Sequence, residues 1–154
     1  MAACSSSPSS SAPKATPSTS AAAAPSTPSS SSSAAQAIKA NWTAFFDAKT
    51  PVAKRVALLE DGSQFASVIR AQAGGGLAAL ASAQVTKVTV TSPTQAAVTY
   101  NILVDGTPEL KGQSGTAVLQ GGTWKVGVTS FCDLLTLENG GNSSKLPAAC
   151  KAAG

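Results

Sequence analysis

The sequence contains no histidine and only seven carboxylates, so few side chains are available to act as an acid, a base or a metal ligand near neutral pH. It has three cysteines but no Cys-x-x-Cys pair, the spacing typical of zinc and redox sites. Asp61 and Asp105 each precede a glycine in a predicted turn, and Tyr100 alternates with core-type residues. We therefore predict no metal, no cofactor and no catalytic residues.

Clustered positive charge is also missing. The eleven lysine and arginine residues are dispersed along the chain, and only Lys54 and Arg55 adjoin. Nucleic-acid-binding surfaces concentrate such residues on one face, so we predict no nucleic-acid partner. No apolar run has the roughly 20 residues that a helix needs to cross a bilayer.

The first 33 residues contain no aromatic or large aliphatic side chain after Met1 and consist almost entirely of Ser, Ala, Pro and Thr. Such a segment has nothing to bury and cannot offset the entropy lost on ordering. We predict a disordered tether over residues 1–33 and a single folded domain over residues 34–154. A processed pro-segment or an artificial linker would have the same composition.

The short stretch Ala2-Ala3-Cys4 ahead of this tether resembles the maturation site of bacterial lipoproteins. The resemblance implies that Cys4 is lipidated and that the protein is exported and held on the membrane by acyl chains. Met1 stands where that family usually has leucine, and the charged and apolar regions of a signal peptide do not precede it. We expect that the sequence starts near the mature N-terminus, with Met1 added.

The other two cysteines lie close together in the C-terminal part. Cys132 is surrounded by apolar residues, and Cys150 follows a polar loop, with seventeen residues between the two. A disulfide between them would fasten a short tail that would otherwise fray, and it would imply an oxidising compartment. Two free structural thiols are the alternative. We favour the disulfide.

Hydrophobic periodicity predicts helices first and strands afterwards. Helices are predicted over residues 34–48, over residues 51–60, and after Ser63. Strands with alternating apolar residues are predicted over residues 84–92, 95–104, 109–120 and 123–130, with glycines at 112 and 115 indicating a bend or bulge. Ser130 with Asp133 fits a capping box for a short final helix. This order predicts an α+β fold with helices on one face of a curved four-stranded antiparallel meander.

A long first helix cupped by a curved sheet resembles the nuclear transport factor 2-like cone, related in shape to cystatin-like folds. Residues from about Ala34 to Leu137 more closely resemble the mycobacterial low-molecular-weight secreted antigen family and its actinobacterial lipoprotein relatives. The residues that carry this resemblance are the early aromatic helix, "ALLEDGSQF", the meander and "GGTWKVGVTSFCDLLTL". The resemblance implies an exported envelope protein and brings no catalytic residue with it.

We therefore expect an extracytoplasmic, lipid-anchored binding or interaction module, with the membrane, an apolar ligand or another envelope protein as its partner. The candidate ligand-binding residues are aromatic: Trp42, Phe45, Phe46, Tyr100 and Trp124. Ordinary core packing is the alternative role for them. An isomerase or dehydratase in the same cone and a structural spacer are the competing functions. A buried carboxylate in a large cavity would favour the enzyme, an apolar cavity the binding protein, and a filled core the spacer.

Overall fold

The computed structural model describes residues 28–74 and 80–152 of the chain. Its elements are α1 (Pro28–Phe46), α2 (Val52–Leu58), the 3-10 helix η1 (Gly62–Phe65), α3 (Ala66–Ala73), β1 (Ala81–Ser92), β2 (Gln95–Val104), β3 (Thr107–Gln120), β4 (Thr123–Val126), α4 (Val128–Glu138), the 3-10 helix η3 (Ser143–Lys145) and α5 (Ala148–Ala152). The predicted α+β order, helices followed by an antiparallel meander, is confirmed.

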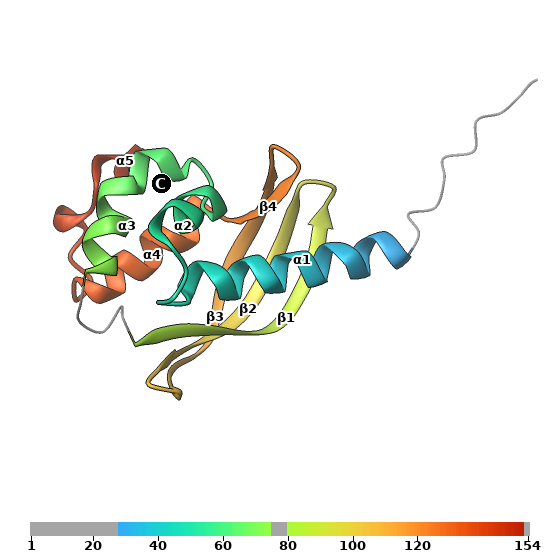
Figure 1. Ribbon diagram of the computed structural model, residues 1–154, viewed down its shortest axis with the longest axis horizontal. Coiled ribbons are helices and arrows are strands. Elements are labelled where there is room, and N and C mark those ends of the chain that lie inside the picture. The colour runs from blue at the N-terminus through green and yellow to red at the C-terminus, as the bar shows by residue number, and fades with distance from the viewer. Residues whose placement is uncertain (1–27, 75–79, 153–154) are drawn as a thin grey trace, which may run out of the picture.

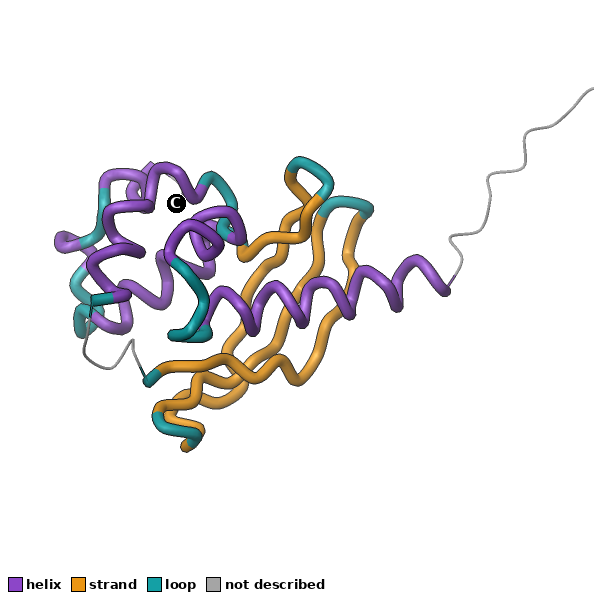
Figure 2. The backbone as a smooth tube through the Cα atoms, viewed as in Figure 1, coloured by secondary structure: helices purple, strands orange, loops and turns teal. Residues whose placement is uncertain are grey.

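The four strands form one open sheet in the order β1-β2-β3-β4, with each strand antiparallel to the next. Helix α1 crosses one face of the sheet, and the other helices gather at one end of it (Figure 1). Figure 2 shows the same division between a helical end and a layer of strands. The pairing of β2 with β3 shifts register beside Gly112, whose φ is +65°. The predicted irregularity is confirmed at Gly112, where glycine adopts this φ without strain, whereas Gly115 pairs with Val98 in regular register.

Helix α1 begins at Pro28, so it includes residues 28–33, for which the composition predicts a tether. Proline suits the first helical position because its missing N–H would have no partner inside the helix. The apolar face of α1 is the predicted one, with Ile38, Trp42 and Phe45 all buried. These residues recur at helical spacing and lie toward the sheet.

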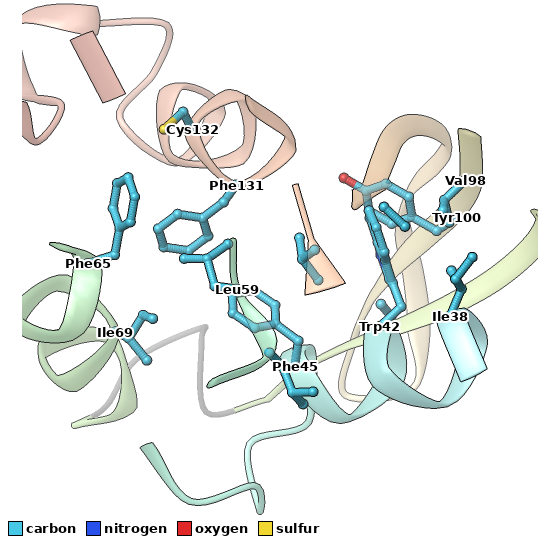
Figure 3. Close-up of a cluster of buried hydrophobic side chains, with 14 of the residues drawn as sticks. Ile38, Trp42, Phe45, Leu59, Phe65, Ile69, Val98, Tyr100, Phe131 and Cys132 are labelled. Carbon is cyan, nitrogen blue, oxygen red and sulfur yellow. The ribbon is translucent and has the colours of Figure 1, made fainter. Parts of the chain in front are cut away.

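The buried side chains of α1 continue into a core shared with the sheet and with α4. The ring centroids of Trp42 and Tyr100 lie 5.2 Å apart, and those of Phe45 and Phe131 lie 5.6 Å apart. Figure 3 shows Trp42 against Tyr100, and Phe131 beside Phe65. Aromatic pairs at these separations favour tilted and edge-to-face contacts, which the interplanar angles of 56° and 86° reflect.

The last strand is shorter than predicted and the helix after it starts earlier. Strand β4 ends at Val126 and α4 begins at Val128, so the prediction of a strand through Ser130 is wrong. The capping box is also wrong, because the buried Ser130 hydroxyl accepts a hydrogen bond from the Thr116 amide at 2.7 Å instead. A carboxylate oxygen of Glu60 accepts from the Val128 amide at 3.0 Å. This distant carboxylate supplies the acceptor that an N-terminal helix amide needs.

The predicted disulfide is present between Cys132 of α4 and Cys150 of α5, with their Cα atoms 5.5 Å apart. That separation is typical of disulfides. Both cysteines are buried. The bond fastens the short helix α5 to α4, which is itself anchored in the core by Phe131 and Leu135.

Candidate functional site

A cavity of about 370 Å³ lies between the helical end of the molecule and the neighbouring ends of strands β1 to β3. Apolar side chains line it from six elements, α1, α3, α4, β1, β2 and β3, and polar side chains line it from α2, α3, α4 and β3. The lining residues are Phe45, Phe46, Arg55, Ile69, Gln72, Ala81, Ile102, Val104, Glu109, Leu110, Phe131, Leu134, Leu135, Leu137 and Glu138. The wall is therefore mostly hydrocarbon with a few polar groups, the usual composition of a ligand site.

Helix α4 separates this cavity from the disulfide-bonded tail. One face of α4 lines the cavity with residues at helical spacing: Phe131, Leu134, Leu135 and Glu138. Cys132 of the same helix forms the disulfide with Cys150 of α5. Two faces of one helix thus have two roles. Because the disulfide ties α5 to α4, it also helps to hold the cavity wall in place.

The lining residues differ in exposure, which distinguishes a closed end from an open edge. Phe45, Ile69, Phe131 and Leu135 are buried. Glu109, Leu110, Leu137 and Glu138 are exposed, and the side chain of Leu137 is 53% exposed. The cavity is closed by core residues and opens toward solvent at an edge formed by β3 and the end of α4.

Arg55 is the charged side chain at the closed end, and it is only 7% exposed. Its Nη2 donates a hydrogen bond to the backbone carbonyl of Asp47, just past the end of α1. Its Nε is buried and has no hydrogen-bond acceptor in the part of the chain that the structure describes. Burial lowers the pKa of Arg55, and the nearby charge of Asp47 opposes that shift. The guanidinium still keeps its charge at physiological pH.

At the open edge, Gln72 Nε2 of α3 donates a hydrogen bond to Glu138 Oε2 of α4 at 2.8 Å. Desolvation raises the pKa of Glu138, and the hydrogen bond from Gln72 acts in the opposite direction. The bond joins α3 and α4 through two residues that are 66 positions apart in the sequence. It closes one side of the cavity entrance.

The structure divides the five predicted aromatic residues into two groups. Phe45 and Phe46 line the cavity. Trp42 and Tyr100 pack in the core, and the partly buried Trp124 packs against that core while its carbonyl accepts a hydrogen bond from Asn41. Burial, with a smaller effect of the Asp133 charge, raises the pKa of Tyr100 to about 12. A phenol with this pKa would be a poor acid or base near neutral pH.

Sequence reasoning missed Arg55 and most of the aliphatic wall. The signal for Arg55 was present, because it follows Val52 by three positions and precedes Leu59 by four, which places it on an apolar helix face. A charged residue at such a position is either paired or functional. The aliphatic residues of the wall carried no distinguishing signal, since ordinary core residues have the same pattern.

Three further predictions concern the lipidated cysteine, a metal site and membrane-spanning helices. Cys4 lies outside the described residues. Among residues 28–74 and 80–152, no group of three His, Cys, Asp or Glu side chains could hold a metal ion. The helices that the structure describes include none long and apolar enough to span a membrane.

Comparison with known proteins identifies the family. A family model described as low molecular weight antigen MTB12, C-terminal domain, matches residues 31–142, which include the sheet, α4 and every residue that lines the cavity. No curated protein and no solved structure matches the chain. The nuclear transport factor 2-like likeness therefore stays a prediction, whereas the resemblance to the mycobacterial antigen family is confirmed. The family match covers more than half of the chain, which therefore belongs to the family of the low molecular weight antigen MTB12 C-terminal domain.

Proposed function

We propose that this protein is a binding module of the cell envelope that holds an apolar ligand in the cavity between its helical end and its sheet. The observation that carries the proposal is the cavity itself, about 370 Å³ in volume and lined mainly by aromatic and aliphatic side chains. Ligand sites have volumes of roughly 300–1,000 Å³ and this kind of lining. An apolar ligand that enters this cavity is removed from water, and this transfer favours binding.

The location of the protein agrees with this role. The antigen family is typically secreted, which supports an extracytoplasmic location. The disulfide between Cys132 and Cys150 fits the oxidising conditions outside the cytoplasm. We further propose that lipid on Cys4 anchors the protein to the membrane, on the strength of the small residues that precede this cysteine.

The two competing functions explain less of the site. A structural spacer would need no cavity of this size. An isomerase or dehydratase would need a buried acid or base, but the lining carboxylates, Glu109 and Glu138, lie at the exposed edge. Tyr100 is buried in the core with its pKa raised to about 12. These observations favour binding over catalysis.

Mass spectrometry of the protein extracted from membranes of the cells that produce it tests the proposal. Under native conditions we expect an additional mass that dissociates when the protein is denatured, which would be the bound ligand. After denaturation the chain should retain the mass of acyl groups on Cys4. A protein that carries neither mass would contradict both the binding role and the anchor, and each mass tests its own part separately.

A further inference from the structure

Arg55 is a buried positive charge with a donor, Nε, that has no acceptor among the described residues. Its side chain is 93% shielded from solvent, and the carboxylate that acts on its charge is that of the nearby Asp47. Its described hydrogen bond goes to a neutral backbone carbonyl, that of Asp47. Burying a charge without a counter-charge is strongly unfavourable, so such groups are normally paired. Arg55 has the Asp47 charge nearby but keeps a buried donor, Nε, that no described residue accepts from.

The surroundings of Arg55 define what an acceptor for this donor would be. Arg55 lines the cavity together with Phe45, Phe46 and Ile69, so an anion brought in by a ligand could lie against its guanidinium. A carboxylate matches the planar fork of a guanidinium and forms charge-assisted hydrogen bonds with it. The rest of the closed end is hydrocarbon, which suits the chain of an amphiphile.

The open edge determines which way such a ligand would enter. Glu109 and Glu138 lie there, and both would repel an anionic headgroup that stayed at the entrance. Leu110 and Leu137 line the same edge, and Leu80 precedes the lining residue Ala81. These three leucines are the exposed large hydrophobic residues of the described chain. Hydrocarbon that extends out of the cavity would lie against Leu110 and Leu137, the two that line it.

We propose that the ligand is a single-chain carboxylic acid, bound with its carboxylate against Arg55 and its chain directed toward Leu110 and Leu137. This inference rests on the proposed binding function and specifies its ligand class. The cavity volume of about 370 Å³ would hold about a dozen non-hydrogen atoms, at roughly the 30 Å³ that a water-sized group occupies in a liquid. Decanoate is a probe of that size, and 1-decanol is its uncharged counterpart.

Calorimetric titration of the full 154-residue chain with decanoate and with 1-decanol at neutral pH tests the proposal. Decanoate should bind about tenfold or more tightly than 1-decanol, the difference expected from one charge-assisted hydrogen bond. Equal affinities would overturn the role of Arg55 and leave the binding function intact. Binding of neither compound would overturn the binding function and this inference together.

Three variants assign the preference to Arg55. Arg55→Met should remove the preference for decanoate while 1-decanol still binds. Arg70→Met is the matched control, because Arg70 is an exposed arginine of α3 that does not line the cavity, and it should leave the preference unchanged. Arg55→Lys keeps the positive charge but loses the planar guanidinium, so it should weaken the binding of decanoate and leave that of 1-decanol unchanged. This variant tests the proposal if Arg55→Met does not fold. Retained preference in a folded Arg55→Met protein would overturn the proposal.

Discussion

Glu138 and Gln72 join the ends of α4 and α3 through a hydrogen bond of 2.8 Å at the entrance of the cavity. Desolvation raises the pKa of Glu138 above its ordinary value of 4.5, and the Gln72 bond counteracts only part of this. In the pH range just above 4.5 the folded protein therefore binds more protons at Glu138 than the unfolded chain does. By linkage, this carboxyl makes the protein less stable as the pH rises through that range.

Glu138→Gln should remove this pH dependence while keeping an oxygen that can accept the bond from Gln72. We expect the free energy of unfolding of the variant to rise relative to wild type as the pH increases from about 4.5 toward neutrality. Urea denaturation of both proteins at a series of pH values measures this difference. A difference that is the same at every pH would show that the Glu138 carboxyl has no raised pKa in the folded protein.

The disulfide should contribute substantially to stability. Replacing both Cys132 and Cys150 by serine, or adding a reductant to the wild type, should lower the free energy of unfolding by about 2–5 kcal/mol, as for other small exported domains. Thermal and denaturant unfolding with and without reductant measure the loss. Cys4→Ser is the control and should melt like the wild type. If reduction left the transition unchanged, the bond would have no stabilising role.

Gly115 of β3 lies against the ring of Trp42. An added Cβ would come within 2.9 Å of two Trp42 ring atoms and of the Ser130 hydroxyl, closer than packed atoms approach one another. Gly115→Ala should therefore destabilise the protein by about 1–3 kcal/mol through overpacking. Ser114→Ala, at the exposed neighbouring position, is the matched control and should have little effect. Equal unfolding midpoints for the two variants would contradict this close approach.

The proposed anchor is tested in cells that produce the protein with its signal peptide. Cys4→Ser should move the protein from the membrane fraction into the medium, because lipid attached to the sulfur is the proposed attachment. Cys132→Ser serves as a control for the general effect of losing a cysteine and should stay with the membrane. A Cys4→Ser protein that remains in the membrane fraction, beside a wild type without added acyl mass, would refute the anchor.

Much of the fold could be predicted from the spacing of apolar residues. Ile38, Trp42 and Phe45 recur at helical spacing, and Val98 and Tyr100 alternate as in a half-buried strand. Both patterns predicted the buried faces that the structure shows. The start of α4 could not be predicted, because its first amide binds Glu60, 68 positions earlier in the chain. The residues next to Val128 in the sequence do not indicate this contact with Glu60.

The site was less predictable than the fold. Aromatic residues indicated a binding region, and Phe45 and Phe46 do line the cavity, but Trp42 and Tyr100 have the same pattern and fill the core. Which of them borders a cavity depends on how α4 packs at the end of the sheet. Arg55 is a candidate because its side chain is buried and its Nε has no acceptor among the described residues, and neither property can be read from the sequence. Hydrophobic periodicity shows which residues lie on the buried face of a helix or strand. It does not show which part of that face borders a cavity.

The most direct test of the account is a titration of the full chain with a neutral apolar fluorophore such as N-phenyl-1-naphthylamine. The wild type should show saturable enhancement at one site, because the fluorophore leaves water for the cavity. Val104→Trp places a large ring in the cavity from β2 and should abolish the enhancement. Ala97→Trp, on the exposed face of the same strand, should not. Equal enhancement in both folded variants would show that the cavity is not the binding site and would contradict the central claim.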